Sequence, residues 1–147
     1  MKAQLDKAID QYVAPLARQY GFVLVNEEAY GMGSLKDYEA GNLFIRILND
    51  KGIVSLEIAP SSYRGKRYDL GLYKEYLDPP KLGVLNLSLQ QQAEFLDSHW
   101  EWLNDALSPS KSMTTLIDIE NAARQRSEKM IGPCFSKDLT LRDPHKS

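Results

Sequence analysis

The spacing of apolar residues predicts a helix at the start of the chain. In residues 3–20, apolar side chains recur at intervals of three and four, as on one face of a helix. They are Leu5, Ile9, Tyr12, Val13, Leu16 and Tyr20. Pro15 lies inside this stretch, and because proline lacks a backbone N–H it predicts a kink or an early break. Gly21 is the expected end of the helix.

The next part of the chain has the patterns of β-strands. An apolar run at 22–25 predicts a strand that ends before the polar residues 26–28, and the glycine-rich residues 30–33 predict a turn. Residues 35–39 alternate weakly, whereas 43–48 and 53–58 alternate clearly around a turn at 49–52. We expect a hairpin with a loop of three or four residues there. The side chains expected on its core side are Leu43, Ile45, Ile47, Val54, Leu56 and Ile58, and those on its wetter side are Arg46, Ser55 and Glu57.

The remaining patterns are helical. Residues 72–77 predict a short helix that ends at Asp78 and the following prolines. Ser88 and Gln91 have the spacing of a capping box and begin one long helix that ends at residues 108–109, and a final helix is expected over about 112–131. The buried side of the long helix comprises Leu89, Ala93, Leu96, Trp100, Leu103 and Leu107. A second apolar flank, formed by Phe95, Trp102 and Ala106, needs a cover; the final helix is the simplest one, and a partner chain or a homodimer is the alternative.

The order of these elements predicts an α+β fold. It comprises an N-terminal helix, a four-stranded, mainly antiparallel sheet, a short helix and two longer C-terminal helices. The length of 147 residues fits a single domain, which we place at residues 1–133. Residues 134–147 have little periodicity and are expected to form a loosely packed tail.

Composition narrows the classes of function. Hydrophobic residues make up 43% and charged residues 26%, and 18 Lys plus Arg against 20 Asp plus Glu give a net charge of -2, which argues against a nucleic-acid partner. One cysteine, Cys134, and two histidines supply neither an internal disulfide nor a zinc site, so no metal or cofactor is expected. The chain shows no membrane-spanning run and no signal-peptide core, so we expect a cytoplasmic protein without a membrane partner.

Few residues offer catalytic chemistry. His99 and His145 are the only candidate bases of a triad, and His99 is expected to be an ordinary packed or surface histidine. Ser108 and Lys111 have the spacing of a serine–lysine acyl enzyme, but they lie where a linker between helices is expected. We therefore predict no catalytic residue and no enzyme activity.

A hydrolase is the alternative that the sequence leaves open. Glu27, Glu28, Asp37 and Glu39 would come together if the first two strands pair, and paired carboxylates serve glycoside or metal-assisted hydrolysis. No metal-binding or catalytic motif surrounds them, and the ordinary interpretation is a polar, solvent-facing sheet edge.

Two surfaces are candidates for binding a partner. One is the acidic stripe of the long helix, which could attract a basic protein; its members are Glu94, Asp97, Glu101 and Asp105. The other is the loop at 63–68, which interleaves cations with aromatics and contributes Tyr63, Arg64, Lys66 and Arg67. Arg64, Lys66 and Arg67 would also suit a nucleic-acid module, a third alternative that the nearly neutral chain disfavours.

Four short motifs resemble those of a group of small bacterial domains. They are the helix-to-strand junction at 20–22, the turn at 49–52, the strand exit at 56–60 and the segment 68–70, and the resemblance spans about residues 5–107. Some of these domains are similar to immunity proteins of polymorphic toxin systems. The resemblance implies a cytoplasmic, non-enzymatic protein that binds another protein, a cognate toxin domain, and neutralises it. It implies no particular contact residue.

Overall fold

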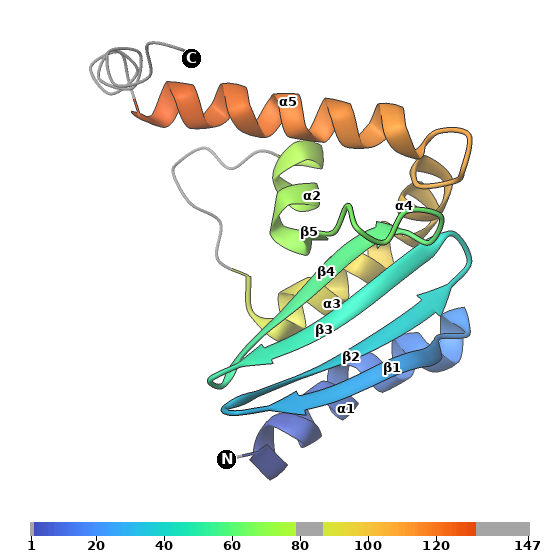
Figure 1. The fold of residues 1–147 in the computed structure, drawn as a ribbon, viewed down its shortest axis with the longest axis vertical. Helices are drawn as coiled ribbons and strands as arrows, with labels where there is room; N and C mark the ends of the chain where they lie inside the picture. The colour runs from blue at the N-terminus through green and yellow to red at the C-terminus, as the bar shows by residue number, and fades with distance from the viewer. Residues whose placement is uncertain (1, 79–86, 132–147) are drawn as a thin grey trace.

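The computed structural model of this protein describes residues 2–78 and 87–131, and these form an α+β fold with an antiparallel sheet, as predicted (Figure 1). The sheet has five strands in the order β1-β2-β3-β4-β5, instead of the predicted four. The strands are β1 Val23–Tyr30, β2 Gly33–Ala40, β3 Leu43–Asp50, β4 Ile53–Pro60 and β5 Tyr68–Asp69. The helices are α1 Lys2–Tyr20, α2 Leu70–Leu77, α3 Leu89–Ser98, α4 Trp100–Ala106 and α5 Ser112–Ile131.

Two strand predictions need correction. β5 was missed because two residues are too few to show an alternating pattern, although Tyr68 and Asp69 pair with Ile58 and Glu57 of β4. β1 continues through the polar residues 26–28 instead of ending before them. All eight of its residues are exposed, and a strand that buries neither face needs no apolar alternation.

Tight turns join the first four strands. The turn between β3 and β4 consists of Lys51 and Gly52 alone, with φ of 56° and 90°, so the loop is shorter than predicted. Positive φ at both central residues is the signature of a type I′ turn, whose twist matches that of the strands it joins. The turns after β1 and β2 are also two residues long and begin with Gly31 and Gly41 at positive φ.

Helices cover one face of the sheet (Figure 1). The predicted core side of the β3–β4 hairpin is confirmed: Leu43, Ile45, Leu56 and Ile58 are completely buried. They pack in one core with residues from all the helices, among them Val13, Leu70, Leu96, Leu103 and Leu116. Among residues 2–78 and 87–131, no helix lies on the opposite face of the sheet, which is called the open face below.

The predicted long helix is divided in two. The capping box at Ser88 and Gln91 is present, but the helix is interrupted at His99, whose ψ of 16° departs from helical geometry. The Ser98 hydroxyl just before it donates a hydrogen bond to the Glu94 carbonyl oxygen at 2.8 Å, the kind of back-bonding that bends helices. α4 then ends at Ala106, before the expected stop at residues 108–109.

Other helix predictions have mixed outcomes. The helix at Ser112–Ile131 and the end of α1 before Gly21, whose φ is 70°, are confirmed. α1 continues through Pro15, so the early break predicted there does not occur. On the apolar flank of α3 and α4, α2 covers Trp102 and Phe95: the Tyr76 ring lies 6.3 Å from that of Trp102, and Lys74 lies over the Phe95 ring. The predicted tail at 134–147, with Cys134 and His145, lies outside the described residues.

Candidate interaction surface

The strand register arranges the open face in four cross-strand rows. Side chains alternate between the two faces along the strands, except at the register shift between Leu24 and Asn26 of β1, so residues directly opposite one another form a row across the sheet. The rows are numbered from the end of the sheet that holds the β1–β2 and β3–β4 turns. The first three are Tyr30–Gly33–Asp50–Ile53, then Glu28–Leu35–Leu48–Ser55, then Asn26–Asp37–Arg46–Glu57–Asp69. The fourth is Val23–Glu39–Phe44–Ala59. The third row is called the charged row below.

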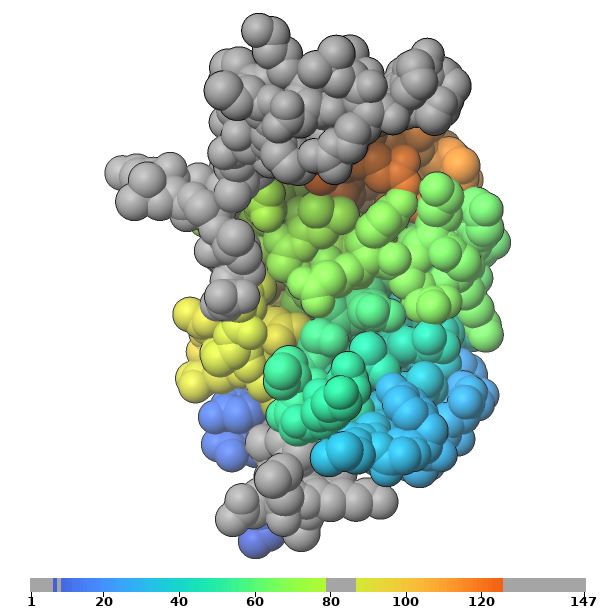
Figure 2. Space-filling view, turned by 60° about the vertical axis from the view of Figure 1, so that its left-hand side comes forward, coloured from blue at the N-terminus to red at the C-terminus, as the bar shows by residue number. Residues whose placement is uncertain are grey.

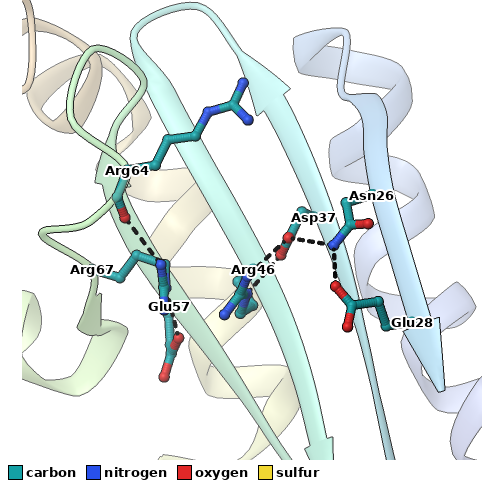
Figure 3. Close-up of polar contacts among 7 residues, drawn as sticks. All are labelled: Asn26, Glu28, Asp37, Arg46, Glu57, Arg64 and Arg67. Carbon is teal, nitrogen blue, oxygen red and sulfur yellow. Dashed lines mark hydrogen bonds and ion pairs between the residues drawn. The ribbon is translucent and has the colours of Figure 1, made fainter. Parts of the chain in front are cut away.

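The charged row is centred on an ion pair between Asp37 and Arg46 (Figure 3). Arg46 donates from Nε to Asp37 Oδ1 at 2.7 Å and from Nη2 to Oδ2 at 3.0 Å. Asn26 Nδ2 donates to Asp37 Oδ2 at 3.2 Å and to Glu28 Oε2 at 2.9 Å. Only 3% of Asp37 is exposed, even though no helix covers this face. The row therefore ties β1, β2 and β3 together through their side chains.

The surroundings of Asp37 determine its charge state. Burial by itself would raise the pKa of the carboxyl group, but the hydrogen bonds from Arg46 and Asn26, together with the positive charges of Arg46 and Arg67, hold the pKa below its ordinary value. The same bond to Asp37 raises the pKa of Arg46. At neutral pH, Asp37 is therefore an ionised carboxylate that is paired with Arg46.

The loop between β4 and β5 folds over the last row of the open face. The Arg64 guanidinium lies 5.0 Å from the centre of the Phe44 ring and forms an ion pair with Glu39. Arg67 Nε donates to Glu57 Oε1 at 3.4 Å, and its Nη1 donates to the Arg64 carbonyl oxygen at 3.2 Å. Cation–π and ionic contacts therefore keep the loop on the sheet, and Phe44 is buried beneath it.

Three of the four predicted loop residues attach the loop to the rest of the protein, and the fourth is exposed. Arg64 and Arg67 hold the loop to the sheet, and Lys66 Nζ lies 3.3 Å from Glu120 of α5. Tyr63 is exposed at the surface. The cations of this loop thus contact the protein's own carboxylates, which is the arrangement of a structural loop more than of a phosphate clamp.

The four carboxylates of the alternative hydrolase do not form one cluster. Glu28, Asp37 and Glu39 face the open side, whereas Glu27 faces the helix side and lies 3.8 Å from Lys36. Asp37 and Glu39 are each paired with an arginine. Within residues 2–78 and 87–131, no group of three or more His, Cys, Asp or Glu side chains could hold a metal ion.

The acidic stripe lies in the helix layer, across the sheet from the loop. Its four members are exposed, but the break at His99 places Glu94 and Asp97 on α3 and the other two on α4. Asp97 Oδ1 accepts a hydrogen bond of 2.5 Å from the Tyr20 hydroxyl, and this bond is the main reason that the pKa of Tyr20 is raised to about 12. Asp105 lies 2.7 Å from Lys111. The structure therefore does not join the stripe and the loop into one site.

The remaining residues that the sequence offered as candidates for catalysis, His99, Ser108 and Lys111, make contacts within the fold. His99 stacks on the Phe95 ring at 4.2 Å, as expected for a packed histidine. Ser108 and Lys111 lie in the connection between α4 and α5, where the Ser108 carbonyl oxygen accepts a hydrogen bond from the Lys111 N–H. Both of these sequence interpretations are confirmed.

The sequence did not predict an exposed apolar patch at the hairpin turns. It comprises Tyr30, Met32 and Ile53, which are 46%, 76% and 75% exposed and are called the tip patch. The Lys51 N–H donates to the Met32 carbonyl oxygen at 3.1 Å, so the two turns are bonded together. The half-buried Leu35 and Leu48 continue the apolar surface toward the charged row. Figure 2 shows the two hairpins, in blue and turquoise, side by side at the surface.

Comparison with known proteins gives no relative from which a role could be transferred. No protein-family model, no curated protein and no solved structure matches this chain. In the described part of the chain, no helix is both long and apolar enough to span a membrane.

Proposed function

We propose that this chain is a non-enzymatic protein-binding module that neutralises a bacterial toxin by direct binding, with the toxin domain docked on the open face. The tip patch is the observation that carries this proposal. Three large apolar side chains from the neighbouring turns of two hairpins are exposed at the same end of the open face, and exposed apolar groups bordered by polar ones are typical of protein interaction sites.

The rest of the open face supports the same proposal. The charged row borders the apolar area formed by the tip patch, Leu35 and Leu48. Paired strands and the Asp37–Arg46 ion pair hold this surface in one conformation, and a preformed surface loses little conformational entropy on binding.

Co-expression with a toxin tests the proposal. The toxin domains to use are the C-terminal domains of polymorphic toxins, beginning with any that the genome encodes next to this gene, and growth of the producing cells reports neutralisation. We expect growth to be restored and the two proteins to form an isolable complex. A toxin that remains fully active when the folded chain is in excess would overturn the proposed function.

Matched substitutions test the docking surface. Met32→Ser combined with Ile53→Ser should weaken the complex at least about tenfold, because interface energy concentrates in a few apolar residues. Met113 on α5 is also exposed, at 49%, so Met113→Ser is the control and should have no effect. Equal affinities for both variants would remove the open face as the docking site. A homodimer that is lost only in the Met32/Ile53 variant would instead assign the tip patch to self-association.

A further inference from the structure

The two edges of the sheet differ in how their backbone groups are satisfied. At the β4 edge, Gln92 of α3 accepts a hydrogen bond from the Leu56 N–H at 2.8 Å and donates to the Val54 carbonyl oxygen at 3.3 Å. The Tyr73 hydroxyl donates to the Ile58 carbonyl oxygen at 3.0 Å, and β5 pairs beside it. This edge is therefore closed by side chains and by a short strand.

The β1 edge is open in the described part of the chain. β1 pairs only with β2, and all eight of its residues are exposed. Val23, Leu24 and Val25 are large apolar residues at its start, with a register irregularity between Leu24 and Asn26. An exposed strand edge is a template on which another strand can pair.

The register shows which backbone groups of β1 are available. The turn at Gly31 and Met32 has two residues, so Tyr30 and Gly33 form a hydrogen-bonded pair at the end of the hairpin. Hydrogen-bonded and non-hydrogen-bonded pairs alternate along an antiparallel ladder, which makes Glu27 and Ala29 non-hydrogen-bonded positions. Their N–H and C=O groups therefore point away from β2, and both residues are exposed.

The charge of β1 decides which kind of strand can be added. Glu27 and Glu28 lie near the middle of the strand and face opposite sides of the sheet, so antiparallel pairing of two copies of β1 about this point would place like charges beside each other, which is destabilising. Glu27 is already paired with Lys36, whereas Glu28 has no ion-pair partner among the described residues. A strand with lysine or arginine beside Glu28 would place opposite charges next to each other on the open face.

We infer that β1 accepts, by strand addition, an extended and basic segment of the partner protein. This inference rests on the proposed function and names the element that the partner supplies. The added strand pairs with the outward backbone groups of Glu27 and Ala29, and its basic side chains lie beside Glu28. Tyr30 belongs to both β1 and the tip patch, so the added strand and the docked body of the partner lie on one continuous surface.

Peptides of defined charge provide the first test. The probe is a capped peptide of about ten residues that alternates lysine and valine, a length that covers β1. We expect it to shift the amide NMR signals of β1 and to slow hydrogen exchange at the Glu27 and Ala29 amides at least about tenfold. A glutamate–valine peptide, and the lysine–valine peptide N-methylated along one edge, should bind at least about tenfold more weakly.

The outcomes that contradict the inference are specific. Absence of any signal change at millimolar probe overturns it, as does equal binding of the N-methylated peptide. Signal changes confined to α3 and α4 would show that the probe binds the acidic stripe through charge alone.

A backbone substitution separates this inference from the proposed function. Ala29→Pro removes an outward N–H that β2 does not use, so the fold should be retained and peptide binding should weaken at least about tenfold. Ala29→Ser keeps the N–H and is the control. If Ala29→Pro does not fold, the N-methylated peptide still decides the question. A toxin complex that survives Ala29→Pro but is lost in the Met32/Ile53 variant overturns strand addition and leaves the proposed function intact.

Discussion

Asp37 of β2 and Arg46 of β3 lie directly opposite each other on the open face and are joined by two hydrogen bonds of 2.7 and 3.0 Å. The pair is well shielded from water, although no helix covers it. Its neighbours in the charged row, Asn26 and Glu57, come from the strands on either side. One ion pair thus connects the exposed β1–β2 hairpin to the buried centre of the sheet.

Removal of Asp37 should destabilise the fold. In Asp37→Ala the largely buried Arg46 guanidinium loses its partner, and we expect the free energy of unfolding to fall by about 2 kcal/mol in urea titrations. The control is Glu27→Ala, which removes the exposed pair with Lys36 and should cost at most about 1 kcal/mol. If the free energy of unfolding falls equally in the two variants, burial gives the Asp37–Arg46 pair no more stability than the exposed Glu27–Lys36 pair has.

The same carboxylate should make stability depend on pH. The folded pKa of Asp37 is lower than its unfolded value of about 3.9, so the pair contributes stability above that value. This contribution is lost as the pH falls through the folded pKa. Urea unfolding between neutral pH and about pH 2 should therefore show a smaller acid-dependent loss in Asp37→Asn than in the native chain. Parallel pH curves for the two proteins would contradict the lowered pKa.

The Tyr20 hydroxyl should lose its proton at a higher pH than an ordinary tyrosine. Its hydroxyl donates to Asp97, which raises the pKa to about 12, and ultraviolet difference absorbance of the phenolate can follow this group. Asp97→Asn should shift the midpoint back toward the ordinary value of about 10. Because the folded pKa is the higher one, the bond stabilises the fold below the unfolded pKa, and this stability is lost as the pH rises through the folded pKa. An unchanged midpoint in Asp97→Asn would contradict the assignment.

Gly33 should not tolerate a side chain. A Cβ at this position would lie 2.6 Å from the Asn49 carbonyl oxygen and 3.0 Å from the Tyr30 ring. We expect Gly33→Ala to lower the free energy of unfolding by about 1–3 kcal/mol, because β2 must move away from β3 or the ring must shift. Gly65→Ala is the control, since its nearest neighbour would be the Tyr63 ring at 3.4 Å, an ordinary contact. A Gly33 variant as stable as the control would show that the turn region adapts freely.

Local chemistry determined most of the elements from the sequence alone. The capping box at Ser88 and Gln91, the stop at Gly21 and the alternation of the β3–β4 hairpin act within a few residues, so a single sequence reveals them. The α+β class followed from the order of these elements. The basic loop at 63–68 and the acidic stripe were also visible, because both are contiguous or periodic in the chain.

Only the tertiary structure decided which of these groups face one another. The tip patch unites Tyr30 and Ile53 through a register that spans four strands, and Asp37 is shielded because β3 places Arg46 opposite it. The cover that α2 gives Trp102 likewise depends on contacts that the apolar spacing of one helix does not encode. A sequence pattern specifies which side of an element is apolar, whereas partners distant in the chain are fixed by register and packing.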